Sequence, residues 1–275
     1  MTESPPTLGV VGLGRMAEAL LEPWIAEGLI APEAVRAVVG SAASRDRWAT
    51  ATLAGHALRV STEAREAWDA PVVLLAVKPQ QLEGVAAAAL QKATEDQGKG
   101  LLISILAGVR LDRLRQLFPS RTCVRAVVNT PALVRQGLTA LAWADDPAPE
   151  ARDWVERLFR RVGDVWTLPE PQLDAFLALT ASGPAFVALM VEALADGAVA
   201  AGLPRALAQT LAPRTLSGTA ALLEGKALHP GQLKDMVSSP AGTTLAGLRE
   251  LERAGLRSAL LEAVLAAAER SRALA

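Results

Sequence analysis

Near the N-terminus the chain reads Leu8-Gly9-Val10-Val11-Gly12-Leu13-Gly14-Arg15-Met16-Ala17, and no other stretch says as much about its architecture. A short buried strand is indicated before the glycines and a helix after them. In such a GxGxxA turn, Gly12 permits the tight bend, Gly14 admits a pyrophosphate, and Ala17 lets the helix sit close to the sheet. The alternative is a glycine-rich turn that only packs. The flanking strand and helix favour dinucleotide binding.

The end of the next expected strand, Ala34–Val39, bears on the choice of cofactor. An NAD enzyme usually carries an acid there that binds the adenosine 2'-hydroxyl. This chain instead reads Gly40-Ser41-Ala42-Ala43-Ser44-Arg45-Asp46-Arg47. Hydroxyl and guanidinium groups suit a 2'-phosphate, so we expect NADPH, with NADH as a second cofactor and with Ser41 and Arg45 as contacts. The alternative is that both arginines are solvated residues at a helix start.

The composition favours small-molecule chemistry. The chain has 275 residues, is 51% hydrophobic and carries a net charge of −1, so it has room for two domains and nothing suggests a nucleic-acid surface. A single cysteine, Cys123, excludes an internal disulfide, and two histidines without a local ligand cluster argue against a metal site. We expect Cys123 to be a small apolar strand residue rather than a catalytic thiol.

The sequence carries no pattern that directs it to a membrane. Residues Met1 to Thr7 lack the positive start and apolar core of a signal peptide, and we expect no apolar run of membrane-spanning length. We therefore expect a soluble, cytoplasmic protein without membrane contact.

Strand and helix patterns alternate from Leu8 to about Trp166, as a mostly parallel, doubly wound α/β sheet requires. We assign residues 1–168 to a Rossmann-like NADP-binding domain. The further strands expected are Val72–Val77, Leu101–Leu106, Thr122–Val127, Leu138–Trp143 and Val165–Leu168, and the helices between them include Gln81–Thr94 and Glu150–Arg161.

Strand patterns stop after Pro171, and residues 169–275 are predicted to be an all-α domain for dimerisation and substrate binding. The expected helices are Asp174–Thr180, Ala185–Ala201, Pro204–Glu224, Leu245–Arg253 and Leu256–Leu274. Several, above all Phe186–Ala201, are apolar on too many sides for an isolated surface helix. We predict a homodimer that covers these faces. The alternative is burial against the first domain alone.

A second informative segment, Ser238-Ser239-Pro240-Ala241-Gly242-Thr243-Thr244, precedes an apolar helical pattern. The first NH groups of a helix lack partners and attract an anion without a cationic side chain. Gly242 lets the backbone approach a ligand, and the hydroxyls of Ser239, Thr243 and Thr244 add directed hydrogen bonds. The alternative is an ordinary helix cap.

Loops that follow the strands complete the expected site, because ligands of open parallel sheets lie beyond the carboxyl ends of the strands. Lys78, between Val77 and Pro79, is expected to meet the cofactor ribose or phosphate, or else to be solvated. The pair Ala107-Gly108 would let a nicotinamide ring lie close to the backbone. Asn129 is expected to tie its loop together, with cofactor contact as the alternative.

Taken in order, these motifs resemble the pyrroline-5-carboxylate reductase family along essentially the whole chain. The resemblance implies an NADPH-binding Rossmann-like domain, often also accepting NADH, and an intertwined helical dimer that sometimes assembles into rings of dimers. It further implies reduction of 1-pyrroline-5-carboxylate to L-proline, the last step of proline biosynthesis. The matching motifs are Gly12-Leu13-Gly14-Arg15-Met16-Ala17, Ala76-Val77-Lys78-Pro79, Asn129-Thr130-Pro131, Ser182-Gly183-Pro184-Ala185-Phe186, Ala195-Asp196-Gly197, Gly202-Leu203-Pro204 and Leu233 to Thr244.

By the same resemblance, the segment from Ser239 to Thr244 holds the substrate carboxylate, and Thr244 matches a threonine thought to bond the ring nitrogen. Two positions depart from the family pattern. Ala241 replaces a glycine although alanine prefers a negative φ, and Phe186 replaces a tyrosine and so lacks its hydroxyl. The predicted site is Gly12, Gly14, Arg15, Met16, Ser41, Arg45, Val77, Lys78, Pro79, Ala107, Gly108 and Asn129 for the cofactor, Ser182, Ser239, Gly242, Thr243 and Thr244 for the substrate, and Thr244 for catalysis.

The expected reaction is hydride transfer from C4 of a reduced nicotinamide to the C=N carbon of the imine. A cyclic imine is basic enough to accept a proton before or during hydride attack, so the protein needs mainly to orient the ring in a cavity shared by the strand-end loops and the helix caps. One rival is a reductase of another imine or keto acid, including the six-membered homologue. Another is a nucleotide-binding sensor without chemistry.

Overall fold

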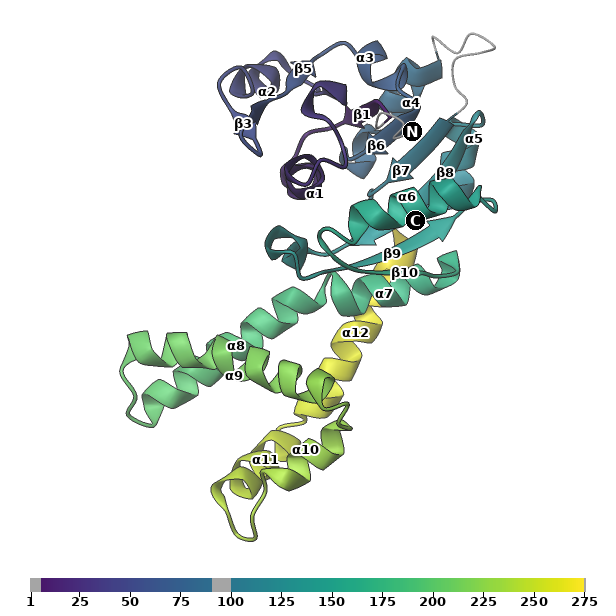
Figure 1. The fold of residues 1–275 in the computed structure, drawn as a ribbon. Coiled ribbons are helices and arrows are strands. Elements are labelled where there is room, and N and C mark those ends of the chain that lie inside the picture. Colours follow the sequence, from purple (N-terminus) through teal and green to yellow (C-terminus); the bar gives the residue numbers. More distant parts are fainter. Residues whose placement is uncertain (1–5, 91–99, 275) are drawn as a thin grey trace. The chain divides into compact units, whose positions relative to one another are not determined.

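The computed structural model describes residues 6–90 and 100–274 (Figure 1). It divides into two compact units. The first runs to Ala181 and takes in the C-terminal end from Ala268, and the second is Ser182–Ala267. The end of the predicted helix Gln81–Thr94 lies outside the described residues, beyond residue 90. The predicted boundary after residue 168, between a cofactor-binding and a substrate-binding domain, stays a prediction, because two compact units do not reveal which ligand each one binds.

The first unit is built on an eight-stranded sheet with the strand order β10-β9-β8-β7-β6-β1-β2-β5. Every pairing in it is parallel except that of β8 with β9. The expected doubly wound fold is therefore confirmed. The strands are β1 Leu8–Val11, β2 Val35–Val38, β5 Arg59–Ser61, β6 Val72–Leu75, β7 Gly100–Ser104, β8 Arg121–Val128, β9 Gly137–Trp143 and β10 Gly163–Thr167, and a separate antiparallel pair is formed by β3 Thr52–Leu53 and β4 His56–Ala57.

Burial on both faces explains why the central strands read as continuous apolar runs rather than as alternating patterns. All residues of β1 and β6 are buried. One face packs around Trp24, whose indole NH donates to the Leu158 carbonyl at 2.6 Å and whose ring meets Phe159 edge to face. The other face packs around Leu102 and Leu114.

The helices of the first unit connect the strands, mostly as crossovers. The link from β8 to β9, residues 129–136, is too short for a crossover helix, and so these two strands pair antiparallel. The helices are α1 Arg15–Ala26, α2 Ala42–Arg47, α3 Arg65–Trp68, α4 Leu82–Leu90, α5 Leu111–Leu117, α6 Pro149–Phe159 and α7 Leu173–Thr180, and the short 3-10 helices are η1 Pro32–Ala34, η2 Pro79–Gln81, η3 Thr130–Val134 and η4 Glu170–Gln172.

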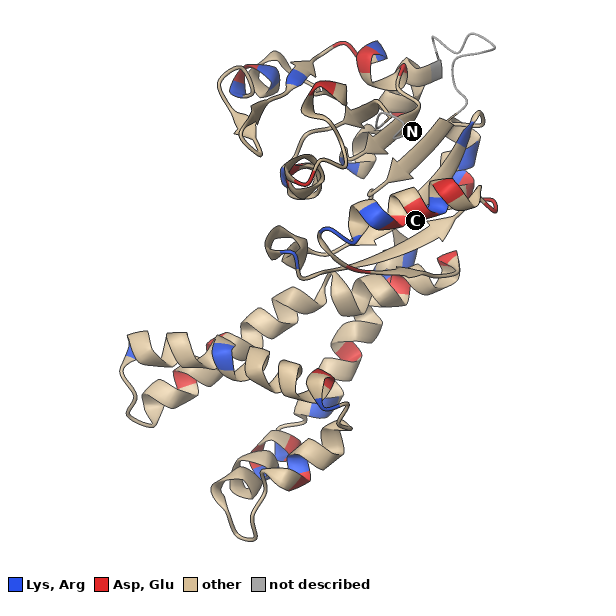
Figure 2. Cartoon of the chain, viewed as in Figure 1, with Lys and Arg blue, Asp and Glu red and all other residues tan. Residues whose placement is uncertain are grey.

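The second unit is entirely helical among its described residues, as predicted. Its helices are α8 Gly183–Ala200, α9 Arg205–Gly225, α10 Pro230–Met236, α11 Thr243–Arg253 and most of α12 Leu256–Ala273. Its small internal core is formed by Ala195, Ala208 and Ala212 between α8 and α9. Charged residues are sparse along α8 and α9 (Figure 2), and large apolar side chains such as Leu189 and Leu194 are exposed.

The expectation that no segment reaches membrane-spanning length was wrong. The helical stretch Glu170–Ala200 is 31 residues long and apolar enough to cross a membrane by length and composition. An uninterrupted run of apolar residues was the wrong criterion, because scattered polar residues still leave the mean hydropathy high. Length and composition are weak evidence by themselves, and a turn at Ala181 and Ser182 separates α7 from α8 within this stretch.

Candidate functional site

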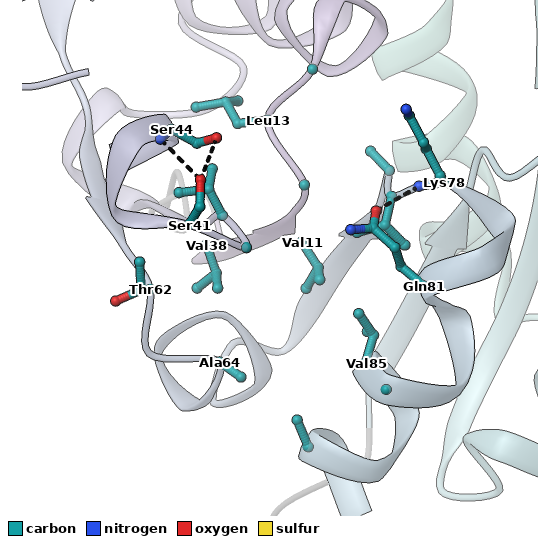
Figure 3. Close-up of a pocket in the computed structure, with 18 of the residues that line it drawn as sticks. Val11, Leu13, Val38, Ser41, Ser44, Thr62, Ala64, Lys78, Gln81 and Val85 are labelled. Atoms are coloured by element: carbon teal, nitrogen blue, oxygen red, sulfur yellow. Dashed lines mark hydrogen bonds between the residues drawn. The ribbon is translucent and has the colours of Figure 1, made fainter. Parts of the chain in front are cut away.

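A cavity of about 990 Å³ opens at the carboxyl ends of β1, β2 and β6 (Figure 3). Its walls come from the glycine turn after β1, from the start of α2, and from the segment that follows β6. The chain runs from β1 to β2 on one side and places β6 on the other, so the cavity lies at the point where the strand order reverses. Ligands of open α/β sheets bind at this switch point, and the volume suits a large cofactor.

The turn after β1 requires glycine at one position and leaves open space at the next. Gly12 has φ +91°, and a Cβ atom there would lie 2.7 Å from the Ala76 carbonyl oxygen and 2.9 Å from Cγ1 of Val77. A Cβ atom on Gly14 would have no atom within 4 Å. Both glycines line the cavity, so the first shapes the turn and the second leaves room for a ligand.

The N-terminus of α1 offers unused backbone donors beside this cavity. No side chain caps it, and among the described residues no acceptor faces the NH groups of Arg15, Met16 and Ala17. The helix is 12 residues long, so its dipole adds a partial positive charge at this end. Free NH groups and a positive helix end are the features that bind a pyrophosphate. The side chain of Arg15 is exposed, and that of Met16 is partly buried.

Hydroxyl groups gather where the cavity meets α2. The Ser44 NH donates to Oγ of Ser41 at 3.2 Å, and the two hydroxyl oxygens lie 3.0 Å apart (Figure 3). Ser41 therefore caps α2, and both serines line the cavity.

The arginine that lines the cavity is Arg47, and the predicted Arg45 does not line it. Arg45 is exposed and pairs with the neighbouring Asp46 at 2.8 Å. Sequence reasoning noted Arg47 but left it out of the predicted contacts. Helix spacing does not single out Arg47, because Ser44 and Arg47 are three residues apart while Ser41 and Arg45 are four apart, and both spacings place residues on one helix face.

The segment after β6 supplies the opposite wall. Val77 and Lys78 line the cavity, whereas Pro79 does not. The Lys78 NH donates to Oε1 of Gln81 at 3.2 Å, which holds the turn (Figure 3). Sequence reasoning missed Gln81 and Trp68, both of which also line the cavity.

Seven predicted cofactor residues do not line this cavity: Arg15, Met16, Arg45, Pro79, Ala107, Gly108 and Asn129. Ala107 is exposed, and Gly108, with φ +72°, is buried so closely beneath the chain end that a Cβ atom would lie 3.1 Å from the Leu274 carbonyl oxygen. Nδ2 of Asn129 donates to the Thr180 carbonyl at 3.0 Å, and its Oδ1 accepts from the Leu138 NH at 2.7 Å. These bonds support the structural interpretation of Asn129, while its contact with a cofactor stays a prediction.

In the second unit, the predicted anion-binding segment leads into the N-terminus of α11. Gly242 precedes this 11-residue helix, and no side chain caps it, so the ordinary-cap alternative is not what the structure shows. A Cβ atom on Gly242 would lie 2.3 Å from Oγ of Ser239, so only glycine leaves that hydroxyl in place. Ser239 and Thr243 are exposed, and Thr244 is partly buried.

Two further features concern the residues predicted to bind the substrate. Ala241 adopts φ +57°, the left-handed region that alanine disfavours. Ser182 precedes α8, is partly buried, and makes no side-chain hydrogen bond that caps the helix. Both Ser182 and the segment 239–244 therefore present hydroxyls at uncapped helix starts.

Cys123 lies in β8 and is fully buried, as expected of an apolar strand residue. Burial, with a smaller contribution from Asp145, raises the pKa of its thiol to about 11, so it is protonated at neutral pH. Within residues 6–90 and 100–274, no group of three or more His, Cys, Asp or Glu side chains could hold a metal ion.

Two family models match the chain. Residues 7–108 match the model described as NADP oxidoreductase coenzyme F420-dependent, and residues 170–274 match the model described as pyrroline-5-carboxylate reductase dimerisation. A pyrroline-5-carboxylate reductase of Synechocystis sp. is 46% identical over 268 residues, which cover 97% of each protein.

Solved structures agree with these matches. The pyrroline carboxylate reductase of Plasmodium falciparum, determined with NADP bound, is 27% identical with a TM-score of 0.85, and 98% of each chain is covered. The pyrroline-5-carboxylate reductase of Coxiella burnetii is 29% identical with a TM-score of 0.84, over 98% of this chain and 99% of that one.

Proposed function

The chain belongs to the pyrroline-5-carboxylate reductase family, and from that premise we propose that it reduces 1-pyrroline-5-carboxylate to L-proline with NADPH, and with NADH as a second cofactor. This reaction is the last step of proline biosynthesis. The observation that carries the proposal is the cavity at the strand switch point, because it combines a glycine turn, free helix NH groups and hydroxyls in the order that a dinucleotide needs.

The cavity fits the cofactor. The NH groups of Arg15, Met16 and Ala17 would hold the pyrophosphate, and the open space at Gly14 lets it approach. Ser41 and Ser44 would meet the adenosine ribose or its phosphate, and Lys78 lies on the opposite wall. The loop at Ala107 and Gly108 follows β7 and would lie at the nicotinamide end, and Asn129, which follows β8, is a further candidate contact there. When bound, the reduced nicotinamide supplies the hydride.

The segment 239–244 would bind the substrate. The uncapped N-terminus of α11 attracts the carboxylate, and the hydroxyls of Ser239 and Thr243 add directed bonds. The Thr244 hydroxyl can donate to a neutral ring nitrogen or accept from a protonated one, so it can hold the ring in either protonation state. Ser182 would add a further hydroxyl contact. Orientation by these groups is sufficient because the imine is basic.

We further propose that the helices of two chains pack together as a homodimer. The large apolar side chains of α8 and α9 are exposed in the single chain, and the matching family model describes dimerisation. Rings of such dimers are the next level of assembly that the family resemblance allows. Burial in the dimer would account for the apolar stretch 170–200 without a membrane. We also propose a cytoplasmic protein that binds small molecules, and its net charge of −1 gives no sign of a nucleic-acid surface.

A cofactor-oxidation assay tests this function. NADPH absorbance is followed with 1-pyrroline-5-carboxylate, then with its six-membered homologue, and both are repeated with NADH. The expected result is rapid oxidation of NADPH with the five-membered imine. Faster oxidation with the six-membered imine would reassign the substrate. Tight NADPH binding without oxidation by any imine would favour a nucleotide-binding module without chemistry.

A further inference from the structure

We propose that Arg47 distinguishes NADPH from NADH and that Glu18 limits this discrimination by competing with the 2'-phosphate for the Arg47 guanidinium. The inference rests on the proposed function, because it assumes that the cavity at the switch point binds the cofactor. It concerns the ratio of the affinities for NADPH and NADH, which depends on individual side chains rather than on the fold.

The lining of the cavity narrows the choice of phosphate-binding side chain. Its charged lining residues, among those the structure describes, are Arg47 and Lys78, and none is acidic. Lys78 follows β6, whereas Arg47 belongs to α2, the helix that follows β2. The adenosine 2'-position lies at the end of this second strand in dinucleotide-binding folds. Arg47 is therefore the cation on the wall where a 2'-phosphate would lie, together with the hydroxyls of Ser41 and Ser44.

The two arginines of α2 differ in their surroundings. Both Nε and Nη2 of Arg45 donate to Oδ1 of Asp46, at 3.0 and 2.8 Å, away from the cavity lining. The Arg47 guanidinium instead lies 5.1 Å from the ring centroid of Trp48, and that ring is buried. A fixed aromatic surface beneath a guanidinium limits the orientations it samples, which favours a phosphate contact from one direction.

Glu18 already forms an ion pair with the Arg47 guanidinium. Nη2 of Arg47 lies 2.6 Å from Oε1 of Glu18, which projects from the first turn of α1. The arginine is half exposed, and exposed ion pairs contribute little to folding. The main consequence of the pair is electrostatic. It neutralises Arg47 before the cofactor binds, and it places a carboxylate beside any phosphate that Arg47 accepts.

This arrangement affects the two cofactors unequally. NADPH brings a doubly charged phosphate toward the carboxylate and must share the guanidinium with it. NADH brings no such group. Glu18 also lies close to the helix end proposed to bind the pyrophosphate, but both cofactors carry that pyrophosphate. The ratio of the two affinities therefore isolates the effect on the 2'-phosphate.

Direct binding measurements test the proposal. Dissociation constants for NADPH and NADH are measured by cofactor fluorescence for the wild type, Arg47→Ala, Glu18→Gln, the double variant, and the matched control Arg45→Ala. Arg47→Ala should weaken NADPH about 10- to 100-fold, the scale of a charged hydrogen bond, and change NADH about twofold at most. Arg45→Ala should change both by about twofold at most. Glu18→Gln should tighten NADPH about fivefold relative to NADH.

The double variant separates competition from a general charge effect. If Glu18 acts mainly through Arg47, most of the selective gain of Glu18→Gln is lost when Arg47 is alanine, and only the part that comes from direct carboxylate–phosphate repulsion remains. The gain should also shrink as salt is raised. A gain of undiminished size in the double variant, a loss of NADPH affinity in Glu18→Gln, equal losses of both cofactors in Arg47→Ala, or a selective loss in Arg45→Ala would each overturn the proposal. Turnover of the wild type with the imine, measured alongside, tests the proposed function separately.

Discussion

At the residue scale, Ala241 carries backbone strain in the segment proposed to bind substrate. Its φ of +57° costs an alanine about 1–2 kcal/mol, whereas glycine adopts it freely. Glycine loses more chain entropy on folding, which offsets part of the gain. We expect Ala241→Gly to raise the free energy of unfolding by about 0.5–1 kcal/mol, measured by urea denaturation at fixed protein concentration.

The matched control for this change is Ala246→Gly within α11. That residue lies in the helix, so glycine there should lower stability by about 1 kcal/mol. If both variants lost stability equally, the left-handed backbone at Ala241 would not be a source of strain.

Burial of Cys123 is expected to make the free energy of unfolding fall as the pH rises above 9. Burial raises the pKa of its thiol above the ordinary value of 9.0 to about 11. Between these values the unfolded chain loses the proton while the folded chain keeps it. The contribution to stability is therefore complete below pH 9 and is lost as pH rises to about 11.

Urea denaturation of the wild type and of Cys123→Ala across this range measures that contribution. The wild type should lose more stability than the variant as pH rises. Because the chain has one cysteine, thiol reagents at pH 8 should label the protein only after unfolding. Rapid labelling of the folded protein would show that the thiol is accessible.

At the element scale, the start of α11 is the part proposed to handle the substrate. Thr244→Val keeps the shape of the side chain and removes one hydroxyl. We expect turnover with 1-pyrroline-5-carboxylate to fall about tenfold or more, the scale of a hydrogen bond to a charged group, while the dissociation constant for NADPH stays unchanged.

The matched control is Thr167→Val, at an exposed position of β10, which should leave turnover unchanged. Steady-state rates of Thr244→Val equal to those of the wild type would remove this hydroxyl from the mechanism.

The elements also differ in how far local sequence predicts them. The start and end of β1 were predicted as observed, because a buried apolar run ends at glycines that only a tight turn accommodates. The long helices were predicted to within a few residues from their periodicity. Helices α5 and α10 were missed, since each has 7 residues and so offers too little periodicity to detect. The antiparallel pairing of β8 with β9 follows from a short connection rather than from composition.

At the scale of the whole molecule, the apolar helices are expected to require a second chain. Leu189 on α8 is 67% exposed in the single chain. A charge placed there would be buried without a partner in the dimer, so Leu189→Glu should shift the protein from dimer to monomer and lower turnover. Sedimentation at micromolar concentration measures the state of assembly.

Gln116→Glu adds the same charge to an exposed position of α5 and should leave assembly unchanged. A Leu189→Glu protein that stayed dimeric at the lowest measurable concentration would place the interface elsewhere.

Local sequence was sufficient for the glycine turn, because it depends on backbone conformation within a few residues. It also indicated a helix start after Gly242 but left open whether a side chain caps it, and the structure shows no such cap. Tertiary structure alone decided which arginine faces the cavity. Arg47 meets Glu18 across 29 residues of sequence, whereas Arg45 is held by its neighbour. Likewise, Asn129 binds the Thr180 carbonyl 51 residues away. A side chain's partner depends on how its helix is rotated against the sheet, and that rotation is set by packing among residues distant in the chain.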